Sequence, residues 1–133
     1  MYKTYNCKIC NKESRFKYSK SNIYCSITCQ NAERTTAIIE DWLSGGSKSI
    51  WKYSIPAWAK KYLIDTRGHQ CEICEKKTHM KQPIPLEVDH ISGDSQDNSL
   101  TNLRLICPNC HSQTDTYKNK NYGNGRKNRK KVV

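Results

Sequence analysis

Eight cysteines in four closely spaced pairs constrain the fold of this 133-residue chain more than any other feature. The first set, with fourteen residues between its pairs, is Cys7-x2-Cys10 and Cys25-x3-Cys29. The second set, with thirty-two residues between its pairs, is Cys71-x2-Cys74 and Cys107-x2-Cys110. Two cysteine pairs at such spacings are typical of one tetrahedral zinc site. The pattern therefore predicts two structural Zn²⁺ ions, each stabilising a small module.

The alternative is four disulfides. Whether the cysteines bind zinc or form disulfides depends on the redox state of the cellular compartment. The N-terminus reads MYKTYNCKIC, without an apolar run of signal-peptide length, and no stretch has the length and hydropathy of a membrane span. We therefore expect a cytoplasmic chain whose cysteines stay reduced and bind metal. Only 35% of the residues are apolar, so hydrophobic burial alone would leave modules of this size marginally stable.

The chain is strongly basic, with a formal charge of +11 that two zinc–thiolate sites would reduce to about +7. Basic residues are concentrated near both ends, and the C-terminal stretch contains no acid. The basic residues of this stretch are Lys118, Lys120, Arg126, Lys127, Arg129, Lys130 and Lys131. Such blocks favour binding to a nucleic acid through counterion release. The alternative is a solvated tail that only improves solubility.

The cysteine sets divide the chain into four expected parts. Residues 1–43 form a treble-clef or ribbon-like zinc finger with a trailing helix, and residues 44–67 form a helical linker. Residues 68–120 form a second zinc-stabilised domain, and residues 121–133 form a flexible basic tail. The fold class is a small α+β protein held together by zinc.

Within the first two parts, we expect two short strands between Cys10 and Cys25, followed by a helix that Gly45-Gly46 ends. A second helix begins between Ser54 and Pro56 and stops at Gly68. The tryptophans Trp42, Trp51 and Trp58 fall in this region. An aromatic stripe at helical spacing favours a core position over base stacking.

The second zinc domain contains two apolar alternations that predict strands at about 86–90 and 103–106, joined by the turn-rich loop SGDSQDNS. Pro108 then opens a helix. Three polar motifs lie on this frame: Asp89-His90 at the end of the first strand, Asn102 before the second, and His111 directly after Cys110.

The order His90, Asn102, His111 between two Cys-x2-Cys knuckles resembles the HNH endonuclease family over about residues 68–120. The fragments LEVDHI and LTNLRLICPNCH carry the resemblance. It implies a ββα-metal fold and a phosphodiester hydrolase in which His90 is the general base. It also implies that Asp89 and His111 bind a catalytic divalent cation, commonly Mg²⁺ or Mn²⁺. Asn102 would hold the loop so that the base keeps its orientation.

The chemistry of phosphodiester hydrolysis agrees with these residue types. A water must lose a proton, and positive charge must stabilise the phosphorane oxygens and the leaving alkoxide. Histidine side chains titrate near pH 6.5, so a neutral imidazole suits the role of base near pH 7. A single hard cation held between Asp89 and His111 would supply the charge.

Several residues near the motif have more than one interpretation. Asp115, four residues after His111, is either a further metal ligand on the same helical face or an exposed acid. Asn98 is a rival to Asn102 but suits the turn better. Arg104 faces away from the core, towards a phosphate or, more simply, towards solvent. His111 could join Cys110 in a mixed zinc site, although four cysteines already complete that tetrahedron.

The sequence therefore predicts a two-zinc HNH endonuclease that nicks or cuts double-stranded DNA with one divalent cation. It would act without a membrane, as a monomer or as a dimer formed on DNA. By family habit, such compact chains are phage-borne or homing enzymes in a bacterial or phage-infected cell. The main rival is a catalytically inactive zinc-finger protein that only binds nucleic acid. A third hypothesis is an RNA-directed nuclease or an adaptor for other phage enzymes.

Overall fold

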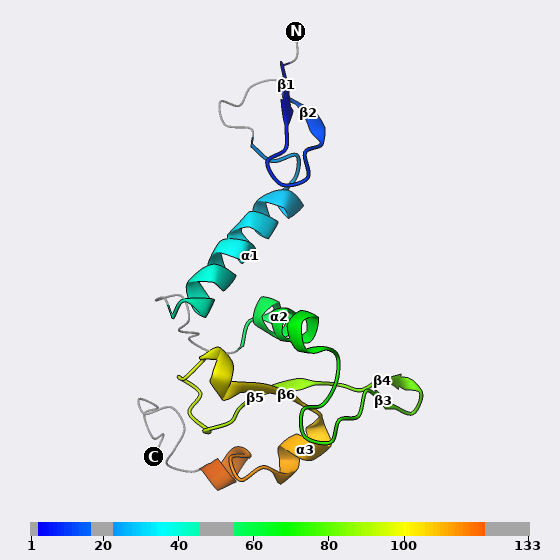
Figure 1. Cartoon of the computed structure of the whole chain (residues 1–133), viewed down its shortest axis with the longest axis vertical. Helices are drawn as coiled ribbons and strands as arrows, with labels where there is room; N and C mark the ends of the chain where they lie inside the picture. The colour runs from blue at the N-terminus through cyan, green and yellow to red at the C-terminus, as the bar shows by residue number, and fades with distance from the viewer. Residues whose placement is uncertain (1–2, 17–22, 46–54, 122–133) are drawn as a thin grey trace, which may run out of the picture. The chain divides into compact units, whose positions relative to one another are not determined.

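The computed structural model describes residues 3–16, 23–45 and 55–121 (Figure 1). The chain forms two compact units, Met1–Asp41 and Trp42–Val133, each described by itself below. Each unit contains one of the two cysteine sets and a short antiparallel strand pair next to it. The small α+β class with two cysteine clusters is confirmed.

In the first unit, strand β1 (Lys3–Asn6) pairs with strand β2 (Glu13–Phe16) in antiparallel register. The chain reverses between them, where the amide of Cys7 donates to the carbonyl of Lys12 at 3.0 Å. The strands therefore lie on either side of the first cysteine pair. β2 is one of the two strands predicted between Cys10 and Cys25, and residues 17–22 of that segment lie outside the described residues. The segment from Cys7 to Cys10 forms the turn of this hairpin, so the strands on its two sides pair with each other.

Helix α1 (Ile27–Leu43) begins between the two cysteines of the second pair, two residues after Cys25. The hydroxyl of Ser26 accepts a hydrogen bond from the amide of Cys29 at 3.2 Å, which caps the free amides of the first turn. At the other end, Gly45 adopts a positive φ of 76° and its amide donates to the carbonyl of Trp42. The predicted helix and its glycine stop are confirmed.

In the second unit, helix α2 (Ala57–Arg67) starts at Pro56 and ends at Gly68, whose amide donates to the carbonyl of Ile64. These bounds confirm the second predicted helix, while Ser54 lies outside the described residues. Strands β5 (Glu87–His90) and β6 (Leu103–Ile106) pair antiparallel, as predicted. Helix α3 (Pro108–Gln113) follows with proline in its first turn.

The elements of the second unit enclose a small hydrophobic core. Helix α2 packs against β6, and α3 packs against β5 (Figure 1). The core residues are Trp42, Leu63, Cys71, Ile84, Leu86, Leu103, Leu105, Ile106 and Cys107. Burying one such aliphatic side chain stabilises the fold by about 1.5–3 kcal/mol. A core of this size leaves a substantial role for the neighbouring cysteine cluster.

The tryptophan prediction is confirmed for the two residues that the structure describes. Trp42 is buried, and its ring meets those of Trp58 and Tyr62 edge to face, with centroids 5.7 and 5.5 Å apart. Trp58 packs partly buried against the core. Trp51 lies outside the described residues.

One hairpin of the second unit was not predicted from the sequence. Strand β3 (Thr78–His79) pairs with strand β4 (Gln82–Pro83) across a two-residue turn. The turn residues, Met80 and Lys81, both have positive φ. Turns of this kind normally contain glycine or asparagine, and their absence concealed the hairpin. Among the described residues, no helix is long and apolar enough to cross a membrane.

Candidate active site and zinc centres

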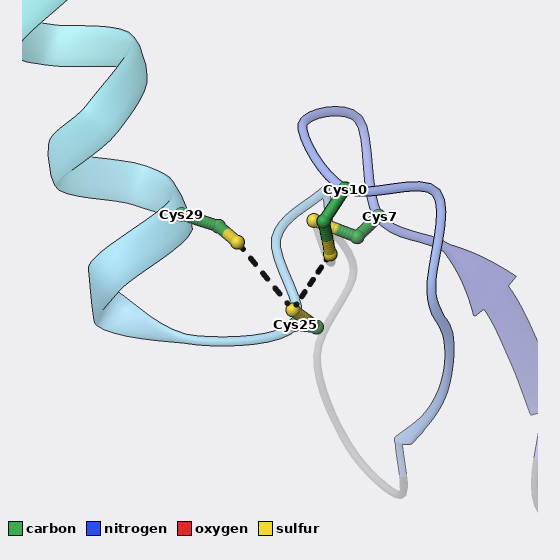
Figure 2. A group of neighbouring side chains, drawn as sticks. All are labelled: Cys7, Cys10, Cys25 and Cys29. Carbon is green, nitrogen blue, oxygen red and sulfur yellow. Dashed lines mark hydrogen bonds between the residues drawn. The ribbon is translucent and has the colours of Figure 1, made fainter.

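The first cysteine cluster brings together sulfurs from two segments of the chain (Figure 2). Cys7 and Cys10 come from the knuckle after β1, while Cys25 precedes α1 and Cys29 lies in its first turn. The sulfur of Cys25 lies 3.5 Å from that of Cys10 and 3.6 Å from that of Cys29. A tetrahedral zinc ion with Zn–S bonds near 2.3 Å separates its sulfurs by roughly 3.8 Å, so the cluster fits zinc.

The second cluster has the same geometry. All four ligand atoms of Cys71, Cys74, Cys107 and Cys110 lie within 4.8 Å of one another. The sulfurs of Cys74 and Cys107 are 3.9 Å apart, and the amide of Cys107 donates to the sulfur of Cys71 at 3.3 Å. Both predicted cysteine sets therefore converge as predicted, and both could hold zinc.

The thiols in each cluster differ in acidity because they lie so close together. The backbone amide of Cys10 is the main cause that lowers the pKa of Cys7 to about 6. Burial opposes ionisation of Cys71, but backbone donors, chiefly that of Cys74, still lower its pKa to about 6. The pKa of Cys110 is raised to about 12, mainly by burial and secondly by contact with the thiol of Cys107. Each cluster thus contains a thiol that ionises readily, as zinc binding requires.

Asp89 and His111, the predicted metal ligands, lie side by side. Asp89 is buried on β5, and one of its carboxylate oxygens, Oδ1, is 3.6 Å from Nε2 of His111 on α3. The other oxygen, Oδ2, accepts a hydrogen bond from Nε of Arg104 at 2.8 Å. The arrangement leaves Oδ1 and Nε2 as two neighbouring donor atoms of the types that divalent cations bind.

Arg104 does not face solvent as the sequence suggested. It lies opposite Asp89 in the β5–β6 register, and its side chain is only 23% exposed. The ion pair brings positive charge to the edge of the candidate metal site. Cross-strand partners of opposite charge attract each other, which explains why the arginine turns towards Asp89.

His111 is oriented from two further sides. Its Nδ1 lies 2.5 Å from Oε2 of Glu87, which is two residues before Asp89 and so on the same face of β5. The ring of Tyr117 meets the imidazole edge to face, with centroids 5.1 Å apart. Glu87 and Tyr117 were not among the predicted site residues. The period-2 spacing of Glu87 and Asp89 was the signal available in the sequence.

His90, the predicted general base, contacts a residue that the sequence analysis assigned to the turn. Its Nε2 lies 2.8 Å from Oδ1 of Asn98, which is buried. An amide oxygen only accepts, so this contact assigns the hydrogen to Nε2 and, in a neutral ring, leaves the lone pair on Nδ1. The indole of Trp42 donates to the main-chain carbonyl of Asn98 at 2.6 Å, which anchors this loop residue to the core.

Asn102 ties the two ends of the same loop together. Its side-chain oxygen accepts from the amide of Ser92 at 2.9 Å, and its side-chain nitrogen donates to the carbonyl of Asp97 at 2.7 Å. Its own carbonyl accepts from the amide of Ile91. In this structure, Asn102 contacts the loop and Asn98 contacts the imidazole.

The segment after α3 folds back onto the loop. Helix α3 ends at Gln113, so Asp115 lies in the following turn and not on the helical face of His111. Asn121 donates to the carbonyl of Gly93 at 2.7 Å. A Cβ at Gly93 would lie only 2.4 Å from the side-chain oxygen of Asn121, so this contact requires glycine. Of the predicted DNA-binding residues, Lys118 and Lys120 lie in this segment, whereas those from Arg126 to Lys131 lie outside the described residues.

A cavity of about 440 Å³ lies beside the Asp89–Arg104 ion pair. Its polar lining includes the guanidinium of Arg104 and residues that follow α3, among them Asp115. The full lining is Ile73, Ile91, Arg104, Cys110, Gln113, Thr114, Asp115 and Thr116. Arg104, the ion-pair partner of Asp89, is the residue that links this cavity to the candidate metal site.

Comparison with known proteins identifies the class of this domain. Residues 71–116 match the HNH endonuclease family, and this part of the chain is an HNH domain. The chain is also similar to the H-N-H endonuclease F-TflIV of Escherichia phage T5, with 46% identity over 57 residues. That match covers 43% of this chain but only 25% of the phage protein. No solved structure matches the chain significantly.

The sequence-based recognition of an HNH domain is therefore confirmed. The matched residues 71–116 include the second cysteine set, the β5–β6 pair and helix α3. They also include His90, Asn102 and His111, the three residues on which the prediction depended. The match supports a nuclease.

Proposed function

We propose that the protein is a divalent-metal-dependent HNH endonuclease that hydrolyses phosphodiester bonds in double-stranded DNA. The observation that carries this proposal is the proximity of Asp89 on β5 to His111 on α3. Asp89 and His111 place two donor atoms 3.6 Å apart, and His90 follows Asp89 directly. The HNH domain match supports the same class of reaction.

The proposed architecture has two parts. The β5–β6 pair and α3 form the ββα-metal unit, with a structural zinc ion at Cys71, Cys74, Cys107 and Cys110. The N-terminal unit is a treble-clef-like finger, because its knuckle and hairpin precede a helix that carries the last cysteine of the set. Zinc in each cluster is structural, since four cysteines fill the tetrahedron and leave no position open for a substrate.

His90 acts as general base in this proposal. Its Nδ1 takes a proton from the attacking water, because Asn98 holds the hydrogen-bearing Nε2 on the other side of the ring. Asn102 keeps the loop closed around this arrangement through its contacts to Ser92 and Asp97. The base therefore keeps a single orientation relative to Asp89.

Asp89 and His111 would hold the catalytic cation, Mg²⁺ or Mn²⁺. Such an ion supplies positive charge for the phosphorane oxygens and the leaving oxygen. Glu87 fixes the ring of His111 so that Nε2 faces Asp89, and metal-binding histidines commonly have such a carboxylate partner. Asp115, exposed in the turn after α3, is a further candidate ligand.

The proposed substrate explains the basic surface near the site. Lys118 and Lys120 follow α3, in the segment where Tyr117 contacts His111 and Asn121 contacts Gly93 of the active-site loop. They would contact phosphates next to the cleaved bond. The finger and the basic residues from Arg126 to Lys131 would add affinity along the duplex. A monomer with one active site would nick, and a dimer formed on DNA would cut both strands.

The test is relaxation of supercoiled plasmid by the full zinc-loaded chain. We expect nicking with Mg²⁺ or Mn²⁺ and none when EDTA is present during a short incubation that leaves the zinc content unchanged. Zinc content is measured in parallel, so that loss of the folded state is not mistaken for loss of the catalytic cation. DNA binding without nicking in any divalent metal would instead identify an inactive nucleic-acid-binding protein.

A further inference from the structure

We propose that the β3–β4 hairpin is a second DNA-contacting arm of the HNH domain, with its lysines on phosphates and Met80 in the minor groove. The inference rests on the proposed function, because it names the surface through which the same enzyme would hold its duplex. It concerns residues 76–83, which the catalytic site does not use.

The hairpin is strongly cationic. Lys76, Lys77 and Lys81 lie within eight residues that contain no acid, and every residue in 76–83 is exposed. The nearest acids along the chain are Glu75 on one side and Glu87 on the other. A cluster with such an excess of lysine attracts a polyanion and gains affinity by releasing counterions from it.

Met80 gives the tip an apolar end. It is 84% exposed, the highest exposure among the large hydrophobic residues described. A flexible, polarizable thioether side chain suits an irregular apolar surface. Proteins that bind the minor groove often place methionine or another apolar side chain against the base steps there. An exposed methionine between lysines fits that mode of binding.

The backbone of the tip is held in a conformation that its residues do not favour. Met80 and Lys81 have φ values of 50° and 62°, in the left-handed region where glycine or asparagine is preferred. Replacement by glycine would relieve this strain. Residues kept in a strained turn are candidates for a role other than stability.

The base of the hairpin is fixed to the catalytic unit. The amide of Cys71 donates to the carbonyl of Lys76 at 3.1 Å, and the amide of Ile84 donates to that of Lys77 at 2.9 Å. Ile84 is buried in the core. Within its unit, the hairpin projects away from the β5–β6 pair (Figure 1). The arm is therefore anchored at its base and exposed at its tip.

The arm can reach DNA that occupies the active site. Ten residues separate Met80 from His90, which limits the distance between them to about 35 Å. One turn of B-DNA is about 34 Å long. The tip therefore lies no farther than about one helical turn from His90, a separation that one duplex can span.

The experiment measures duplex affinity against salt concentration in the full zinc-loaded chain carrying His90→Ala. That background removes cleavage, so a failure of the nuclease proposal and a failure of the hairpin proposal remain distinguishable. In Lys77→Gln/Lys81→Gln, the slope of log affinity against log salt should fall by about 2, with about 10-fold weaker binding near physiological salt. The matched control, Lys60→Gln/Lys61→Gln on α2, makes the same charge change and should have a smaller effect.

A second variant separates binding from folding. Met80→Gly should raise the thermal midpoint by about 2–4 °C, because glycine favours the positive φ. It should also weaken duplex binding about fivefold, since the apolar tip is lost. Unchanged affinity in both hairpin variants would overturn the proposal, and so would an equal loss in the Lys60/Lys61 control.

Discussion

Oδ1 of Asn98 lies 2.8 Å from Nε2 of His90, and the main-chain carbonyl of the same asparagine accepts a hydrogen bond from the indole of Trp42. Asn98 thus connects the proposed base to the hydrophobic core. The same buried residue makes both contacts, one to the imidazole and one to Trp42. The ring of His90 is therefore held by the packing of the core as well as by strand β5.

Replacing Asn98 should therefore affect turnover more than DNA binding. In Asn98→Leu the acceptor is lost while the branched shape of the side chain is kept, and we expect kcat for nicking to fall about 10–100-fold with duplex affinity unchanged. Asn98→Asp keeps an acceptor at the same place and should retain more activity. The measurement is single-turnover nicking beside a binding titration. Equal activity of the leucine variant and the original protein would contradict the role.

The second relationship concerns Glu87 and His111. Glu87→Gln weakens the acceptor that orients the imidazole, and we expect the affinity for the catalytic cation to fall about 10–100-fold. The readout is the Mn²⁺ concentration that gives half-maximal nicking. Glu75→Gln, an equivalent change at an exposed position of the same unit, serves as control. An unchanged Mn²⁺ requirement in Glu87→Gln would show that Glu87 does not support the metal site.

The contribution of Asp97 to stability should depend on pH. Hydrogen bonds from the hydroxyl and amide of Ser99 hold the pKa of Asp97 below its ordinary value. A carboxyl with a lowered folded-state pKa stabilises the fold above its unfolded pKa, near 3.9, and loses that contribution as pH falls through the folded value.

Asp97→Ala should accordingly lower the denaturation midpoint at pH 7 by a small amount, and the difference should shrink under acidic conditions. The measurement is urea denaturation of both proteins from pH 7 downwards, with zinc content checked at each pH. A difference that grows as the pH falls would contradict the assigned sign.

Local patterns explain why so much of the fold was predictable. Cysteine spacing indicated both clusters, and the apolar alternation around Val88 and Leu105 indicated the paired strands. Proline and glycine marked helix ends at Pro108 and Gly68. Each of these signals depends on neighbours within a few residues of the sequence.

The contacts that complete the site could not be read in the same way. Glu87 and His111 are 24 residues apart, and the Asn98–Trp42 contact joins residues 56 apart. Such pairs form only when separate elements pack together. The β3–β4 hairpin was missed for a different reason, since Met80-Lys81 is an unfavourable sequence for the turn that it forms. Arg104 was misplaced because the alternation of β6 did not reveal its partner, Asp89.

Loss of the second cysteine cluster should affect folding and nicking, whereas loss of the first should affect duplex binding. Cys71→Ser should unfold the HNH domain and abolish nicking, because the free energy of structural zinc binding, about 10–16 kcal/mol, is also folding free energy. Cys7→Ser should leave nicking largely intact and weaken duplex binding. Zinc content and circular dichroism identify the affected unit. Loss of nicking to the same extent in both variants would contradict separate roles.

In the proposed mechanism, His90 is the general base that activates the attacking water. The most direct test compares plasmid nicking by the original protein and by His90→Ala in Mg²⁺, at equal zinc content and at saturating protein. General-base catalysis contributes about 10²–10⁴-fold, so we predict a rate loss of that size with unchanged duplex affinity. Nicking by His90→Ala at the original rate would contradict the claim.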